Sequence, residues 1–152
     1  MGPFVIFLRC FSLFILVAAA SAQEISVKLI DVRNGRAMAN EPVAVRFLAS
    51  NPEEQNRKDL QPLRLTTGTD GIARFSLPNM HALGISVDAP SLSLFRCGAS
   101  VHVKSEVLLQ AGAAAQNSCG QSVGVRPKPG EIVLFARPMH WWERLLAPLT
   151  RE

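Results

Sequence analysis

The chain has 152 residues, with 16 lysines and arginines against 12 aspartates and glutamates, and it contains no tyrosine. The basic residues are scattered, and the one adjacent basic pair, Arg57-Lys58, follows Glu53-Glu54 in a polar stretch. Because nucleic-acid binding needs a clustered basic patch, this distribution excludes a nucleic-acid partner. A chain of this length is expected to form a single domain with its own hydrophobic core.

The first 22 residues predict an export signal. Arg9 is their only charge, and the apolar run Phe11–Ala20 is followed by small residues up to Ala22. This is the pattern of a signal peptide that is cleaved before Gln23. A retained membrane anchor is the alternative, but the run is shorter than the roughly 20 residues needed to cross a bilayer. Cys10 precedes the apolar run instead of following it, so no lipid anchor is expected.

Cleavage would leave residues 23–152, with 15 basic residues against 12 acidic ones and a net charge of +3. We expect a periplasmic or extracellular protein. Its predicted parts are a β-domain over residues 23–138 and a C-terminal helix and tail over residues 139–152.

Alternating apolar residues predict strands in the β-domain. In residues 25–30, Ile25, Val27 and Leu29 share one face and Ile30 lies on the other, which is the pattern of a strand with one buried face. Further strand-like runs lie at residues 42–47, 63–65, 72–77, 83–87, 92–97 and 101–103.

Turns and surface segments separate these runs. Asn34-Gly35 and Thr69-Asp70-Gly71 have the composition of tight turns, and the second predicts a hairpin. Residues 51–61 are almost entirely polar and predict a surface loop. Residues 113–125 are small and polar, and we expect them to wrap over the surface.

Two helices and a central strand are predicted in the second half. Glu106–Ala111 has good helix formers, with Ser105 as the expected N-cap and Gly112 just past the end. Glu131–Arg137 is almost continuously apolar, which is typical of a strand buried on both faces. Met139–Ala147 predicts a two-turn amphipathic helix.

Cys97 and Cys119 are the two cysteines that remain after cleavage. An even number of cysteines in an exported chain predicts a disulfide. The alternatives are redox thiols or metal ligands, but the two residues are not in a Cys-x-x-Cys arrangement.

Many short strands between turn residues predict an all-β fold. We expect an immunoglobulin-like or prealbumin-like β-sandwich of about seven strands, with one short internal helix and a short C-terminal helix.

The segments Leu29–Gly35, Pro42–Val45 and Thr69–Phe75 resemble the carboxypeptidase regulatory-like or transthyretin-like β-sandwich family over about Glu24–Leu77. The second half, with Cys97, residues 117–120 and residues 128–142, resembles small secreted bacterial proteins that carry this sandwich. The resemblance implies export and no known reaction. It supplies no catalytic residues.

Enzymes with similar folds have sites that this chain lacks. The hydroxyisourate hydrolases need several histidines and an arginine, and they end in Tyr-Arg-Gly-Ser, whereas this chain ends in Leu149-Thr150-Arg151-Glu152. The ring-cleaving dioxygenases hold iron with tyrosines and histidines. His81, His102 and His140 are far apart in the sequence, so neither a metal site nor a cofactor is expected. A hydrolase with an unfamiliar site near His81 or His102 stays open as an alternative.

Trp141 and Trp142 are the candidate binding residues. Paired indoles suit a sugar ring, a protein partner or a membrane interface. The interpretation that the sequence favours is structural, with one indole closing the open end of the sandwich while Leu145 and Leu146 cover an edge. The expected function is a secreted, non-enzymatic module for binding or support at the cell surface, with a glycan or protein partner. A peripheral membrane protein attached by this helix is a further alternative.

Overall fold

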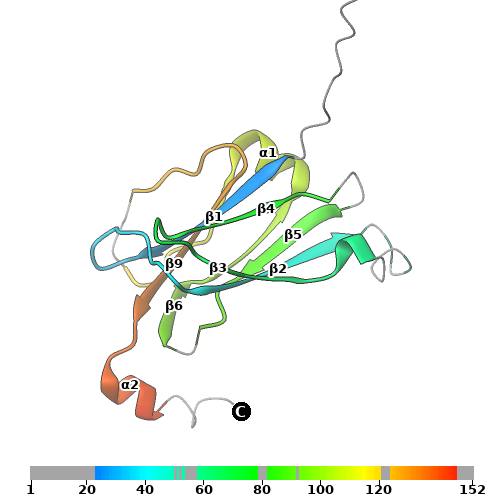
Figure 1. Cartoon of the computed structure of the whole chain (residues 1–152). Coiled ribbons are helices and arrows are strands. Elements are labelled where there is room, and N and C mark those ends of the chain that lie inside the picture. The colour runs from blue at the N-terminus through cyan, green and yellow to red at the C-terminus, as the bar shows by residue number, and fades with distance from the viewer. Residues whose placement is uncertain are drawn as a thin grey trace, which may run out of the picture.

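The computed structural model describes residues 23–49, 51, 53, 58–78, 82–91, 93–120 and 124–146. The predicted signal peptide, His81, residues 52 and 54–57 of the predicted loop at 51–61 and the last residues, 147–152, lie outside the described residues. The described residues form two packed β-sheets with two short α-helices (Figure 1).

The predicted β-sandwich is confirmed, with nine strands in the described part of the chain. The strands are β1 (Glu24–Asp31), β2 (Pro42–Ala49), β3 (Leu63–Thr66), β4 (Ile72–Ser76), β5 (Ala82–Asp88), β6 (Leu94–Gly98), β7 (Ser100–Lys104), β8 (Ala113–Ala114) and β9 (Glu131–Pro138). The helices are α1 (Ser105–Ala111) and α2 (Trp141–Leu146), and Lys58–Leu60 forms a 3-10 turn. One sheet has the order β4-β1-β9-β6, with β8 also paired to β9, and the other has the order β3-β2-β5-β7. The hairpin predicted at Thr69-Asp70-Gly71 is wrong, because the strands on either side of this turn, β3 and β4, belong to different sheets.

The core lies between the sheets, as the alternation predicted. Ile25, Val27 and Leu29 of β1 are fully buried. Phe47 of β2 packs edge-on against Phe75 of β4, with 6.0 Å between ring centroids. These two rings belong to different sheets, so they join the two layers of the sandwich.

β9 is the central strand that its apolar run predicted. All residues from Ile132 to Ala136 are buried. β9 pairs with β1 in parallel along one edge and with β6 and β8 along the other. The parallel register places Ile30 beside Phe135 on the outer face, where both are buried. The expectation that β1 has only one buried face is therefore wrong at Ile30.

Two segments expected at the surface contribute to the core. Leu60, in the predicted loop at 51–61, is buried. Ala113–Ala114 form β8 against β9, and Ala115 after them is buried. Two residues are too short a strand to show a period in the sequence.

The internal helix α1 forms where it was predicted, but Lys104 occupies the N-cap position and the predicted cap, Ser105, is the buried first helical residue. Gly112 follows the helix with a φ of 73°, and its N–H donates to the carbonyl of Leu108 at 2.9 Å. The same carbonyl accepts the N–H of Gly130 at 2.8 Å. These bonds tie α1 to the turn that precedes β9.

α2 lies at one end of the sandwich. Because β1 and β9 run in parallel, the carboxyl ends of both strands lie at the same end of their sheet. Figure 1 shows α2 beyond the ends of β9 and β6, projecting away from the two sheets. The predicted helix over Met139–Ala147 is thus present as the shorter Trp141–Leu146.

Candidate binding face on the C-terminal helix

An ion pair holds α2 at the end of β9. Arg137 donates from Nη1 to Oε2 of Glu143 at 2.7 Å and from Nη2 to Oε1 at 2.5 Å. The two side chains are only 19% and 11% exposed. Two parallel charge-assisted hydrogen bonds fix the orientation of the partners as well as their distance. The Glu143 side of α2 therefore faces the sandwich.

Neighbouring groups complete this anchor. Oε2 of Glu143 also accepts the N–H of His140 at 2.8 Å, as a glutamate at the third helical position does in a capping box. The guanidinium carbon of Arg137 lies 4.3 Å from the centroid of the Phe95 ring on β6, which is a cation–π contact. The hydrogen bonds from Arg137, and then the one from His140, lower the pKa of Glu143 from 4.5 to about 2. Glu143 is therefore ionised at neutral pH.

The other side of α2 carries three large apolar side chains that face water: Trp141 is 75% exposed, Trp142 49% and Leu145 68%. At about 100° per helical residue, they form a stripe about 100° wide, with Glu143 on the other side of the helix. We refer to these three residues as the apolar face of α2. The prediction that an indole closes the open end of the sandwich is wrong, because the Arg137–Glu143 pair turns the opposite side of the helix inwards.

The two indoles differ in their surroundings. The rings of Trp142 and His140 are stacked, with centroids 6.1 Å apart and planes 4° apart. Trp142 thus has the imidazole as a parallel neighbour, and Trp141 is the more exposed of the pair. Arg144 is also exposed on α2, and within the described ranges its side chain makes no ion pair.

Sequence reasoning did not single out Arg137 and Glu143. They are six residues apart with Pro138 between them, so no helical or strand spacing links them. The available signal was the glutamate three residues after His140, which matches the position of the acid in a capping box. Arg137, near the end of the buried strand β9, supplies the positive charge that pairs with this glutamate.

Among the described residues, His102 has no catalytic partner within hydrogen-bond reach. It lies on β7, directly across from Ser86 of β5 in the antiparallel register. Its side chain is exposed, and no hydrogen bond joins it to Ser86 or to any other described side chain. His81 lies outside the described residues, so the structure does not test the other half of the hydrolase alternative.

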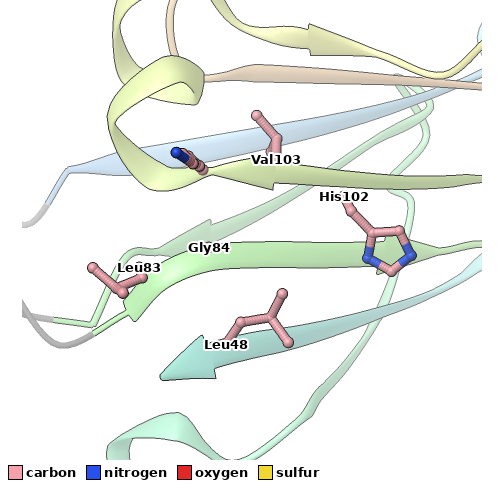
Figure 2. A pocket seen from close by; sticks show the side chains of 6 residues that line it. Leu48, Leu83, Gly84, His102 and Val103 are labelled. Atoms are coloured by element: carbon pink, nitrogen blue, oxygen red, sulfur yellow. The ribbon is translucent and has the colours of Figure 1, made fainter. Parts of the chain in front are cut away.

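A shallow hollow of about 310 Å³ lies beside His102 (Figure 2). Its residues come from the end of β2, the start of β5 and the end of β7. Figure 1 shows the end of β2 at the end of the sandwich away from α2. The hollow is open at Gly84, which has no side chain, between the exposed leucines Leu48 and Leu83. The lining residues are Leu48, Leu83, Gly84, His102, Val103 and Lys104. They include no carboxylate, serine or cysteine that would complete a hydrolytic site with His102.

Cys97 and Cys119 form the predicted disulfide, with Cα atoms 5.1 Å apart. Among the residues that the structure describes, no three histidine, cysteine or acidic side chains gather as metal ligands. No described helix is long and apolar enough to span a bilayer.

No family model matches the chain, and no curated protein does either. The resemblance to the carboxypeptidase regulatory-like or transthyretin-like family therefore stays a prediction. Two solved structures show a partial similarity. The full-length major pilin SpaD from Corynebacterium diphtheriae is 10% identical with a TM-score of 0.45, over 77% of this chain and 30% of the pilin. The fimbrial protein FimP from Actinomyces oris is 10% identical with a TM-score of 0.43, over 78% of this chain and 30% of that protein. This chain thus spans less than a third of the length of either protein.

Proposed function

We propose that this chain is an exported, non-enzymatic β-sandwich protein that binds a partner at the cell surface through the apolar face of α2. The observation that carries the proposal is the exposure of Trp141, Trp142 and Leu145 on a helix whose orientation is fixed. Contiguous exposed apolar side chains mark interaction sites on folded proteins. Tryptophan in particular is enriched among the hot-spot residues that contribute most of the binding energy in protein interfaces.

Two further observations support the proposal. The disulfide between Cys97 and Cys119 is stable in the oxidising compartments outside the cytoplasm, which agrees with an export signal at residues 1–22. His102 has no nucleophile, acid or metal partner in the described structure, which favours binding over catalysis.

Site-specific photo-crosslinking tests the proposal. A photoreactive amino acid is placed at Leu145 of the full chain, expressed with its own N-terminal segment, and the adducts formed on intact cells are analysed by mass. Val107 on α1 is the matched control, because it is also an exposed apolar residue on a short helix. We expect an adduct with an envelope component from position 145 only. Equal labelling from both positions would contradict the proposal.

An activity screen adds an independent check. Turnover of a substrate by the exported chain, lost on His102→Ala, would contradict the non-enzymatic assignment and restore the hydrolase alternative.

A further inference from the structure

We propose that the partner of α2 is the surface of an anionic lipid bilayer, with Trp141, Trp142 and Leu145 inserted between the headgroups and the acyl chains. This inference rests on the proposed function and specifies its partner.

The shape of α2 suits an interface between water and hydrocarbon. Its apolar stripe is about 100° wide, and the polar anchor, Glu143, lies on the side that faces the sandwich. Helices with one apolar and one polar side lie in the plane of a membrane surface, with the apolar side turned towards the acyl chains. The amphipathic indole is the side chain that favours this depth, because its ring is apolar and its N–H bonds to the headgroup region.

The charge of α2 complements anionic lipid. The only acidic residue of α2, Glu143, is neutralised by Arg137, so insertion brings no unpaired carboxylate towards the headgroups. Arg144 lies beside the apolar face, exposed and without an ion-pair partner in the described structure. Residues 23–152 carry 15 basic residues against 12 acidic ones, so the net positive charge of this part of the chain also favours an anionic membrane surface.

The position of α2 leaves the apolar face accessible. The helix projects beyond the ends of β9 and β6, so the two sheets do not shield it from a flat surface (Figure 1). A two-turn helix buries little area, and binding is therefore expected to be reversible and to depend on both the apolar and the electrostatic contribution.

Two other partners fit these observations less well. Neutral sugar rings stack on exposed indoles, but they carry no charge that would pair with Arg144. A second copy of the chain would offer the hollow at its other end, but that hollow carries Lys104, which has the same charge as Arg144. Neither of these partners would make use of the positive charge of α2.

Flotation with vesicles tests the inference. The exported chain is mixed with phosphatidylcholine vesicles that contain or lack phosphatidylglycerol, and the bound fraction is measured. We expect binding to the anionic vesicles that weakens as salt is added. The double variant Trp141→Ala, Trp142→Ala should reduce the partition coefficient at least about tenfold, since two indoles no longer leave water. Leu145→Ala should reduce it by a smaller factor.

Leu83→Ala is the matched control, because Leu83 is an exposed leucine at the other end of the sandwich. Its flotation should equal that of the wild type. All variants share the same N-terminal segment, so any difference between them reports α2. Because the altered side chains are exposed, each variant should keep its cooperative unfolding transition.

Three results would overturn the lipid inference: no flotation of the wild type, equal flotation of the double variant, or self-association that the double variant abolishes. If flotation fails while the crosslink from position 145 still captures an envelope protein or glycan, the lipid inference falls and the proposed function stands. If the crosslink is also absent, both fall.

Discussion

Acidification is expected to release α2 from the sandwich. The ionised form of Glu143 accepts two hydrogen bonds from Arg137 and one from His140, so its pKa is lowered from 4.5 to about 2 when α2 is docked. A group with a lowered pKa stabilises the docked form above its free pKa, and this contribution is lost as the pH falls through the docked pKa. The window for release therefore runs from about pH 4.5 down to about pH 2.

Two other carboxyls set the background for this experiment. A side-chain hydrogen bond from Arg33 lowers the pKa of Asp31, and one from Arg74 lowers the pKa of Asp70. Both start from a reference pKa of 3.8, below that of a glutamate, so the stability that they contribute is lost at lower pH than the onset for Glu143. We expect α2 to respond before the sheets do.

The two indole N–H resonances in proton–nitrogen NMR spectra report the change. The chain has two tryptophans and both lie on α2, so these signals come from that helix alone. The chemical shifts of these two signals should change reversibly between about pH 4.5 and pH 2. The amide signals of β1 and β9 should stay unchanged near pH 4.5, at the start of this range. Glu143→Gln should show the released positions already at neutral pH and no titration. Indole signals that stay constant down to pH 2, or that titrate equally in Glu143→Gln, would refute the reasoning.

Three stability predictions concern the sandwich and are checked by urea or thermal unfolding. Replacing Cys97 and Cys119 by alanine opens a link across 22 residues, which should cost about 3 kcal/mol and lower the Tm by roughly 10 °C; an unchanged Tm would contradict it. Gly112→Ala should cost about 1–3 kcal/mol from the positive φ alone, and more because the new Cβ would overlap the carbonyl of Lys128. Thr67→Val should cost about 1–3 kcal/mol, because the buried hydroxyl accepts a backbone N–H at 2.9 Å and donates to a carbonyl at 2.7 Å; Thr67→Ser, which keeps the hydroxyl, should cost less.

The strands were predictable where the alternation of apolar and polar residues, or a continuous apolar run, extended over several positions. Residues 25–29 show the alternation of a strand over five positions, and the apolar run of β9 shows a strand with two buried faces. β8 has only two residues, and its pairing with β9 arises from the tertiary fold. Ile30 is buried beside Phe135, its partner in the parallel register, and a pairing partner cannot be read from one segment alone.

The orientation of α2 was not predictable from its own sequence. The helical spacing of Trp141 and Leu145 groups the apolar residues on one side, but it does not say whether that side faces the protein or water. The usual assumption is that it faces the core. Here Arg137 reverses the outcome, because a strong bidentate pair on the polar side decides which side docks. Sequence patterns record which residues share a face, whereas docking depends on partners elsewhere in the fold.

The anchor and the apolar face of α2 act as one unit. A six-residue helix is too short to persist in water by itself, since nucleation is unfavourable and few hydrogen bonds follow it. α2 therefore depends on Arg137, which is held at the end of a strand that is paired along both edges and also contacts Phe95. A partner then meets indoles on a helix that is already ordered, so binding avoids much of the entropy cost of folding that segment. The paired strand β9 thus holds α2 in place, and α2 presents its apolar face outside the sandwich core.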